Sequence, residues 1–288
     1  MSDLLTVAWA GLTVGASYAL VALGIVIAQR VTRVVNLAQG EFSVLGGFTT
    51  ATLTAAGWPV ALALVPAAAL GGALAAVQEW ALLRRLRDAT GPILLLTTVA
   101  LAVTFQGAEV LLWGRDPRTG PVLVSGDPVV LGGLRMSRQS LALVALAVVL
   151  TLVAHAVIDR SATGKAMSAV AEDPDAARMT GIDVYRLRLL GLVLAGTIGG
   201  LAGAVALPLF LVDFSRGLAL SLKGFVAAVL GGSSVGGALA GGLALGVIEA
   251  LTVRYVSDLF SDVATSLVLI AVVLAGPYVG RVRAMVGA

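Results

Sequence analysis

The sequence contains no cysteine and a single histidine, His155. Disulfide bonds, thiolate metal sites and a cysteine nucleophile are therefore excluded, and the chain cannot build a histidine-rich metal site on its own. Only 12% of the 288 residues are charged, whereas ordinary soluble domains carry about 25%. Aromatic residues make up 5% and no tract is rich in Arg or Lys, so we expect no nucleic-acid partner. The low charge also excludes intrinsic disorder, which requires low hydrophobicity and high charge.

Apolar residues are abundant. They make up 59% of the chain, the mean hydropathy is +1.01, and 35 residues are glycine. A helix needs about 20 mostly apolar residues to cross the lipid hydrocarbon. Eight such segments can be marked: 4–28, 34–56, 60–78, 93–113, 139–158, 189–212, 224–248 and 263–280. We therefore predict an all-α, polytopic membrane helix bundle in which residues 1–288 form a single transmembrane domain embedded in membrane lipid.

The basic residues between the segments indicate an orientation, because cytoplasmic loops carry an excess of Lys and Arg. With the N-terminus outside, ten basic residues of the loops between the first segments fall inside: Arg30, Arg33, Arg84, Arg85, Arg87, Arg160, Lys165, Arg178, Arg186 and Arg188. Six fall outside: Arg115, Arg118, Arg135, Arg138, Arg216 and Lys223. Asp3 before the first segment argues against a cleaved signal peptide, which would carry positive charge there. We predict residues 57–59 outside, and 84–88 and 160–186 inside.

The segment 224–248 is unusual because paired glycines surround Ser233 and Ser234. Paired glycines around two serines are typical of an interruption. We predict a broken helix or a short hairpin. A hairpin would leave Arg281 and Arg283 inside at the end of the last span, whereas one smooth crossing would reverse that end.

The stretch 159–188 is the most polar of the chain and is predicted to be a cytoplasmic loop. Asp173 can cap a helix whose first residue is Pro174. Gly181 can end that helix by adopting a left-handed conformation. A capped helix of about two turns, from Glu172 to Gly181, is therefore predicted between two spans.

Three stretches resemble the permease subunits of ABC importers for branched-chain amino acids. The first is GLTVGASYALVALG at 11–24 with NLAQGEF at 36–42 and LGGF at 45–48. The second is AEDPDAARMTGI at 171–182, and the third is GFVAAVLGGSSVGGALAGGLALGVIEA at 224–250. One departure is Gln39, where many relatives carry His.

The resemblance implies a non-enzymatic transport subunit in a bacterial inner membrane. Such a subunit pairs with a second, homologous permease subunit, usually as a heterodimer, and receives its solute from an extracytoplasmic binding protein. Two cytoplasmic ATPase subunits would bind ATP and Mg²⁺. This chain has no phosphate loop of its own, because Ala166 follows Gly164-Lys165 and residue 159 is Asp. The resemblance assigns the ATPase-coupling role to the predicted capped helix, with Glu172, Asp173, Pro174, Ala177, Arg178 and Gly181.

Polar residues within the apolar segments are candidates for the translocation pathway: Asn36, Gln39, Glu41, Ser233 and Ser234. A charge deep in the bilayer costs about 3 kcal/mol or more, so Glu41 should face protein or water. The alternative is that the group at 36–41 lies at the cytoplasmic interface and caps the second span. We also expect the Gly-rich elements 36–48 and 224–242 to approach one another near the pathway.

Other charges at the span ends are interpreted as orienting charges. We expect Glu109 to pair with Arg115, and we note Glu79 close to Arg84, and Arg254 five residues after Glu249.

Glycines four residues apart allow helix backbones to approach closely in lipid. The pairs selected as packing sites are Gly11 with Gly15, Gly196 with Gly200, and Gly237 with Gly241.

Two other function classes stay open at this point. An ion-coupled secondary transporter would need acidic residues deep in the broken helix, but 224–248 carries no charge. An intramembrane enzyme would need a Ser-Lys or paired-acid site. The solute is also open: leucine, isoleucine and valine are the default, and similar permeases carry urea, short amides or aromatic and other small carboxylates.

Overall fold

The computed structural model describes residues 2–86 and 89–286, with the backbone alone for 2, 273 and 275–286. Arg87, counted above among the inner charges, lies outside the described residues, and so does position 88. The helices in chain order are α1 (Ser2–Thr32), α2 (Gln39–Ala55), α3 (Val60–Gln78), α4 (Gly91–Trp113), α5 (Arg138–Ala154), α6 (Ala162–Glu172), α7 (Pro174–Met179), α8 (Val184–Ala206), α9 (Arg216–Leu230), α10 (Val235–Tyr255) and α11 (Ser261–Val286). Two π-helical turns, η1 (Glu79–Leu83) and η2 (His155–Asp159), extend α3 and α5. A 3-10 turn, η3 (Asp258–Phe260), precedes α11. The two strands, β1 (Val129–Leu131) and β2 (Leu134–Met136), pair with each other.

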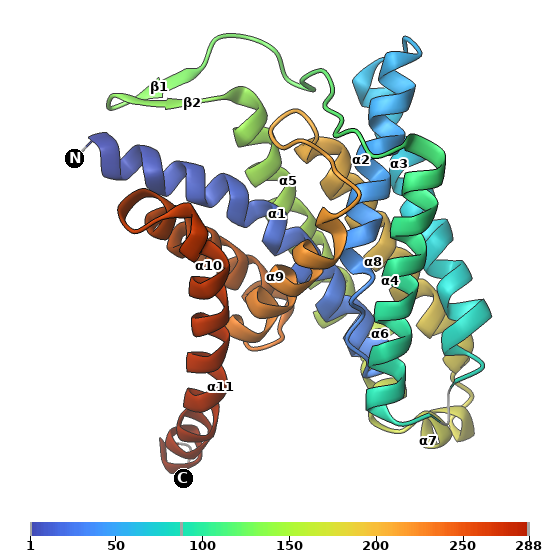
Figure 1. The fold of residues 1–288 in the computed structure, drawn as a ribbon. Helices are drawn as coiled ribbons and strands as arrows, with labels where there is room; N and C mark the ends of the chain where they lie inside the picture. Colours follow the sequence, from blue (N-terminus) through green and yellow to red (C-terminus); the bar gives the residue numbers. More distant parts are fainter. Residues whose placement is uncertain (1, 87–88, 287–288) are drawn as a thin grey trace.

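Helix α1 crosses the centre of the bundle (Figure 1) and packs against α5, α8, α9 and α10. In its most apolar 18-residue window, 83% of the residues are buried. A helix that is hydrophobic all round is expected inside a bundle, since it has no polar face to present to water. The first segment of the sequence is therefore the core of the fold.

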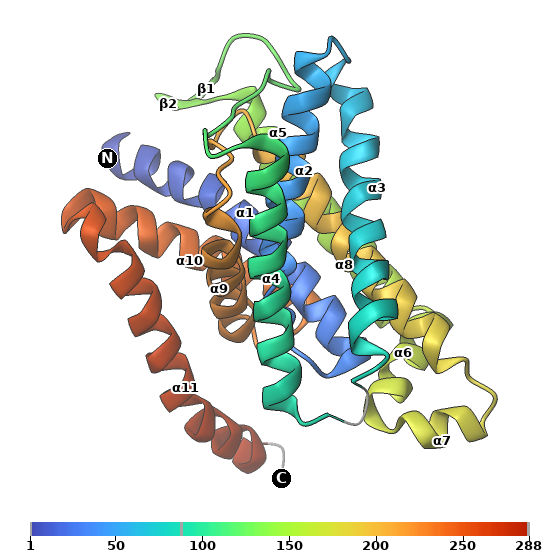
Figure 2. The same cartoon turned by 45° about the vertical axis from the view of Figure 1, so that its right-hand side comes forward.

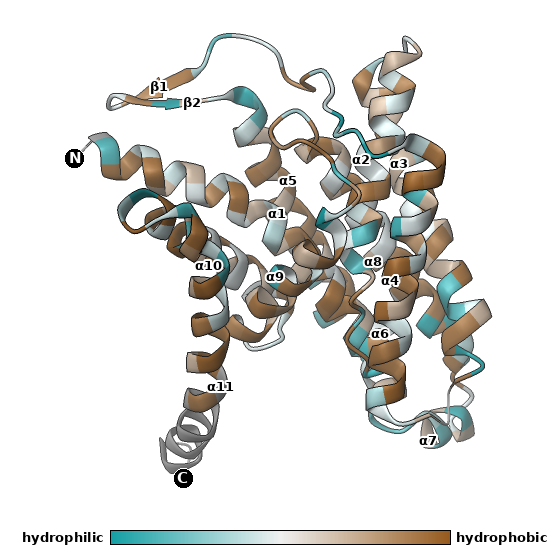
Figure 3. Cartoon of the chain, in the orientation of Figure 1, coloured by the Kyte–Doolittle hydropathy of each residue, from teal (hydrophilic) through white to brown (hydrophobic). Residues whose placement is uncertain are grey.

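The outer helices show the opposite pattern. The described parts of α3, α4 and α5 are rich in hydrophobic residues, which are brown in the ribbon of Figure 3, and many of these residues are exposed, among them Leu62 of α3 and Leu152 of α5. Leu111 of α4 is 88% exposed. Exposed leucines on a long helix are consistent with lipid as the surrounding solvent, so the prediction of a polytopic helical membrane bundle is confirmed.

The predicted number of eight segments is not confirmed. Within the described residues, six helices are long and apolar enough to cross a membrane. Helix α2 is shorter, with 17 residues, because the chain runs irregularly through 33–38 before it begins. The predicted segment 224–248 is interrupted at 231–234, and α9 and α10 pack against each other on either side of this turn as a hairpin.

Glycines set the distance between α1 and α10. A Cβ on Gly15 would lie 2.6 Å from the Gly242 carbonyl oxygen, and one on Gly11 would lie 2.9 Å from that of Gly246. Backbones this close leave no room for any side chain, and such contacts supply van der Waals packing where lipid gives no hydrophobic drive.

The other two predicted glycine pairs also lie at close contacts. A Cβ on Gly196 would be 2.3 Å from the Gly71 oxygen, and one on Gly200 would be 2.2 Å from the Ala67 oxygen, so both face α3. The third pair lies inside the hairpin rather than between distant helices: Gly237 faces Gly231, and Gly241 faces Ala227.

The two ends of the bundle differ. The turn between α2 and α3 and the β1–β2 hairpin lie at one end, and α6, α7 and the end of α11 lie at the other, in both ribbon views (Figures 1 and 2). This arrangement agrees with the predicted separation of 57–59 from 160–186. The β-hairpin, with Val129 opposite Met136, and an isolated β-bridge between Arg118 and Val212 are the β-structure in the described residues, and both involve the long predicted outer loop.

The predicted inner loop contains two helices where one was predicted. Asp173 caps α7, because its Oδ1 accepts hydrogen bonds from the amides of Asp175 and Ala176 at 2.9 and 3.0 Å. Gly181 has φ +82° and ends the helix. Glu172, predicted to begin this helix, is instead the last residue of α6. Local capping signals thus located the helix, and the longer α6 before it was missed.

Sidedness can be tested with introduced cysteines, since the chain has none of its own. Thr163→Cys on α6 should react with an impermeant thiol reagent only after the membrane is opened, whereas Trp58→Cys should react in intact cells. Both side chains are exposed. Thr163 is a better position than Ser161, whose hydroxyl caps α6 and whose loss would cost about 1 kcal/mol. Labelling of the Thr163→Cys variant in intact cells would reverse the orientation.

Candidate functional site

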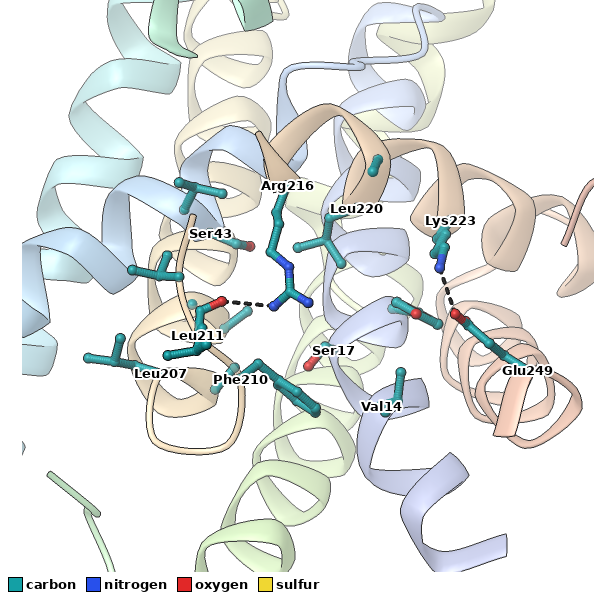
Figure 4. A pocket seen from close by; sticks show the side chains of 17 residues that line it. Val14, Ser17, Ser43, Leu207, Phe210, Leu211, Arg216, Leu220, Lys223 and Glu249 are labelled. Atoms are coloured by element: carbon teal, nitrogen blue, oxygen red, sulfur yellow. Dashed lines mark hydrogen bonds and ion pairs between the residues drawn. The ribbon is translucent and has the colours of Figure 1, made fainter. Parts of the chain in front are cut away.

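A cavity of about 330 Å³ lies between α1, α2, α8, α9 and α10 (Figure 4). Its walls are mostly apolar and include Val14, Leu207, Phe210 and Leu220. Ordinary ligand pockets range from about 300 to 1,000 Å³, so this cavity can hold one small solute.

Charged and hydroxyl side chains enter the cavity at a few points. Arg216, in the first turn of α9, directs its guanidinium into it, and Nη1 donates to the Leu211 carbonyl oxygen at 2.8 Å (Figure 4). Within the described part of the chain, no carboxylate lies within ion-pair distance of Arg216. Ser17 of α1 and Ser43 of α2 are buried lining residues, and neither hydroxyl has a hydrogen-bond partner among the described residues.

A second cation in the cavity is paired. The Lys223 Nζ lies 2.6 Å from Glu249 Oε1 and 3.2 Å from Asp262 Oδ1, and it lies over the Tyr18 ring, 5.6 Å from its centroid. Ser261 donates to the same Glu249 oxygen at 2.9 Å. Glu249 Oε2 is buried and has no partner in the described structure. The Lys223–Glu249 pair links α9 to α10.

One turn before Ser43, at the start of α2, buried residues connect α2 to α8 and α9. We expect this contact to lie on the inner side of the cavity. Gln39 Nε2 donates to the Ala195 carbonyl oxygen of α8 at 2.7 Å, and the amide of Gly40 donates to Ser221 Oγ of α9 at 2.7 Å. Gln39 and Gly40 are both buried. We call the buried residues 36–41 the floor, because they hydrogen bond to α3, α4, α8 and α9 just before Ser43, which lines the cavity.

Asn36 holds the irregular segment that leads into the floor. Its side-chain amide exchanges two hydrogen bonds with that of Gln78, at 3.2 and 3.0 Å, and its Oδ1 also accepts from the Ala38 amide at 3.1 Å. The Leu37 amide donates to Thr98 at 3.2 Å. These bonds satisfy backbone groups of a non-helical segment at membrane depth, as buried polar groups require.

Glu41 and Glu109 are both buried acids. Glu41 lies against Gly217, where any Cβ would meet its carboxylate, 1.9 Å from Oε2. Glu109 is 0% exposed, and neither of its carboxylate oxygens finds a hydrogen-bond partner among the residues described. The predicted pairing of Glu109 with Arg115 is therefore wrong: Glu109 faces the protein interior.

Ser233 and Ser234 lie elsewhere. Both are exposed in the turn between α9 and α10, where Ser233 has φ +51° and Ser234 caps α10 by accepting from the Gly237 amide at 3.1 Å. Neither lines the cavity or shares a hydrogen bond with the floor. The start of α2 meets residues 217–221 at the beginning of α9, so the expected contact lies N-terminal to the predicted 224–242 segment.

At the predicted inner end, ion pairs join the helices. Glu79 Oε1 lies 3.3 Å from Arg188 Nε, while Arg84 lies over the ring of Tyr185 at 4.5 Å. The Glu79 carboxylate therefore pairs with Arg188 of α8, while the Glu79 carbonyl oxygen accepts from the Arg84 amide at 2.9 Å.

Asp159 joins η2 to α1, because its Oδ1 lies 2.5 Å from Arg30 Nη1. Its Oδ2 lies 2.8 Å from His155 Nδ1, within η2 itself. His155 thus forms a hydrogen bond with Asp159 one helical turn further along the chain.

Sequence reasoning missed the residues that give the cavity its polarity: Ser17, Ser43, Arg216, Lys223 and Glu249. Arg216 and Lys223 were counted only as outer charges. A serine inside an apolar helix carries no local signal, because it often bonds to its own helix.

The profile of the family described as "Branched-chain amino acid transport system / permease component" matches residues 7–275. The chain belongs to this permease family. The resemblance noted in the sequence is thereby confirmed, and the permease is a multi-pass protein of the inner membrane.

Individual proteins similar to this chain are also named as permeases of ABC transport systems. The permease is 30% identical over 282 residues to the high-affinity branched-chain amino acid transport system permease protein LivH of Escherichia coli K12, covering 93% of this chain and 92% of the relative. It is 29% identical to LivH of Salmonella typhimurium over the same shares. It is also 28% identical over 299 residues to the guanosine ABC transporter permease protein NupQ of Bacillus subtilis, covering 96% and 90%.

Proposed function

We propose that this permease moves a small solute across the inner membrane as one subunit of an ATP-driven importer. One observation carries the proposal: a cavity between five helices ends at a buried polar floor that bridges α2, α8 and α9. This is the form of a pathway that is closed on one side. Transport then requires the hydrogen bonds of the floor to α8 and α9 to break, so that the start of α2 moves away from α9.

The energy for this movement comes from partners. Two ATPase subunits bind ATP and Mg²⁺, a second homologous permease subunit completes a heterodimer, and an extracytoplasmic binding protein delivers the solute. Helix α7 is the contact with an ATPase: Met179 is 90% exposed, while Ala177 packs in a small core with Val170 of α6 and Val184 of α8. A push on α7 therefore reaches α8, which lines the cavity.

The proposed solute is a branched-chain amino acid. The names of the LivH relatives support it. A nucleoside is the second candidate, because a relative of similar identity is named for guanosine. Urea, amides and small carboxylates stay as further alternatives.

The importer is tested by reconstituting the permease with its cognate partners in proteoliposomes. Uptake of labelled leucine should require ATP, the binding protein and hydrolysis-competent ATPase subunits. Uptake that continues with a hydrolysis-dead ATPase, and that follows an imposed ion gradient, would contradict the proposal and favour a secondary transporter.

Glu41→Gln should lower the transport rate about tenfold, which corresponds to about 1.4 kcal/mol in the barrier. The carboxyl is buried in the closed floor and gains more hydration than an amide when the floor opens, so its loss disfavours opening. The apparent affinity for the loaded binding protein should stay unchanged. Rates are measured at several binding-protein concentrations with saturating ATP.

Asp127→Asn, an equal change of charge in the exposed outer loop, is the matched control and should transport normally. A changed solute preference in Glu41→Gln alone would contradict a floor that only gates, and would assign recognition to Glu41.

A further inference from the structure

We propose that Glu109 is a proton-binding site of the closed permease: its carboxyl group holds a proton while α2 packs on α9, and releases it to water when this contact opens. The inference rests on the proposed function, because it adds a ligand, the proton, to the opening step that transport requires. Its consequence is that the rate of import rises with pH.

Glu109 is buried without a partner that could neutralise its charge. Its side chain is 0% exposed, and both carboxylate oxygens lack a hydrogen-bond donor among the residues that the structure describes. An ionised carboxylate that is shut away from water without a cation is costly, and a buried acid normally avoids this cost by taking up a proton. A proton is therefore the ligand that fits this carboxyl group.

The charges that act on Glu109 have the same sign as its own. They belong to Glu41 of α2 and to Asp213 in the loop before α9. Glu41 is itself 1% exposed, and its Oε2 has no hydrogen-bond partner within the described chain. Nearby acids disfavour each other's ionised forms, so this neighbourhood also favours a protonated carboxyl group.

The cations on the surrounding helices have other partners. Helices α1, α3, α4, α8 and α9 pack against α2, and α2 and α9 pack against α4. In the described parts of these helices, the ion pairs are Lys223 with Glu249 and Asp262, Arg188 with Glu79, Arg186 with Asp183, and Arg30 with Asp159. Arg216 is exposed and donates to the Leu211 carbonyl oxygen. None of these cations forms an ion pair with Glu41 or Glu109.

Glu109 lies at the contact that must open. Helix α4 runs beside α2 (Figure 2) and also contacts α9. One turn before Glu109, the ring of Phe105 lies 5.9 Å from that of Phe42 of α2, and one turn after it Trp113 stacks on Phe48. Movement of the start of α2 away from α9 would therefore admit water to Glu109. The O–H bond then breaks and the proton passes to water, and on closure the carboxylate takes a proton back.

The sign of the pH effect follows from this exchange. The open permease holds one proton fewer than the closed permease, so raising the pH favours the open form. The rate of import should rise by at most about tenfold per pH unit, which is the limit for the release of one proton. Because the proton leaves and returns within one cycle of opening, it regulates import and does not drive it.

The first test detects the proton in the resting complex. The permease is assembled with its partner subunits, without ATP, in a detergent that has no ester groups, and infrared difference spectra are recorded between the wild-type permease and its variants. A protonated carboxyl group has a carbonyl-stretch band distinct from the bands of a carboxylate. Glu109→Gln should lose one such band. Asp127→Asn, the same change of charge in the exposed outer loop, is the control and should keep it.

The second test measures the coupling to transport. Uptake is followed in proteoliposomes with the same buffer on both sides, at several pH values, with saturating ATP and loaded binding protein. Glu109→Gln carries a side chain that cannot ionise, so the ratio of its rate to that of the wild-type permease should be near one at low pH and fall as the pH rises. The ratio for Asp127→Asn should stay constant, and Glu109→Asp should restore the pH dependence.

Two results would overturn the proton site: loss of a carboxylate band instead of a protonated-carboxyl band in Glu109→Gln, or a ratio of rates that does not change with pH. If Glu109→Gln does not assemble, the spectrum of Glu109→Asp decides, because the protonated-carboxyl band should shift in that variant. Uptake that an imposed pH gradient drives without ATP would instead contradict the proposed function. The infrared result does not depend on transport, so the two failures are distinguishable.

Discussion

Replacing Gly242 with alanine is expected to separate α1 from α10 and to prevent folded protein from accumulating. The added Cβ would lie 2.4 Å from both the backbone nitrogen and the Cα of Ala19, and neither atom can rotate away. Overpacking of a well-packed core costs about 1–3 kcal/mol and occasionally more, and here the obstruction is backbone in the most buried helix. We expect loss at or above the upper end of that range, measured as the thermal midpoint and the yield of monodisperse complex in detergent.

Gly236→Ala is the matched control on the same helix. No atom lies within 4 Å of a Cβ at Gly236, so the substitution should be neutral or stabilise α10 by at most about 1 kcal/mol, since alanine is the better helix former. Equal stability of the two variants would show that α1 and α10 do not pack as closely as described.

Gly181→Val is expected to uncouple ATP hydrolysis from transport, with transport falling tenfold or more while the permease still assembles. Gly181 has φ +82° at the end of α7, and no atom lies within 4 Å of a Cβ there. The expected destabilisation of the end of α7 in this variant therefore comes from the backbone conformation alone, and not from a steric clash of the side chain. A left-handed residue costs about 1–2 kcal/mol for a side chain other than glycine, and more for branched valine. The end of α7 should shift, and the push on α8 would be lost.

Gly181→Asn separates conformation from side-chain bulk, because asparagine tolerates the left-handed region. It should keep near-normal coupling. Binding-protein-stimulated ATPase activity and uptake are measured in the same proteoliposomes. Tight coupling in the valine variant would show that the conformation at residue 181 is not needed, and that α7 acts as a plain loop.

Local signals in the sequence were sufficient for α7. Asp173, Pro174 and Gly181 act on backbone groups within a few residues of themselves, so their spacing already fixes a cap, a first turn and a stop. The same reasoning located the interruption at 231–234. It failed for Glu172, because both sides of Asp173 are helical and the sequence offers no signal for which helix an acid joins.

The cavity could not be predicted, because its members come from five helices whose rotation is set by packing. Ser17 is a lining residue only because Gly15 and Gly242 allow α10 to lie against α1. Glu109 was assigned to Arg115 by sequence distance, whereas the rotation of α4 turns it inward. Asn36, Gln39 and Glu41 could be selected from the sequence, because polar residues are conspicuous in an apolar stretch, and their place in the pathway stays a prediction. Their partners Gln78 and Ala195 were not foreseen.

The burial of α1 has a consequence for biogenesis. This helix is synthesised before the other described helices, yet most of its neighbours, α8, α9 and α10, follow it by more than 150 residues. During synthesis its apolar surface must rest in lipid until those helices arrive, and they must then displace lipid from a helix already in the membrane. Folding of this permease thus depends on contacts between α1 and helices far along the chain, and such non-local contacts are expected to form slowly. A nascent chain truncated before α8 would be inserted but could not enclose its own first helix.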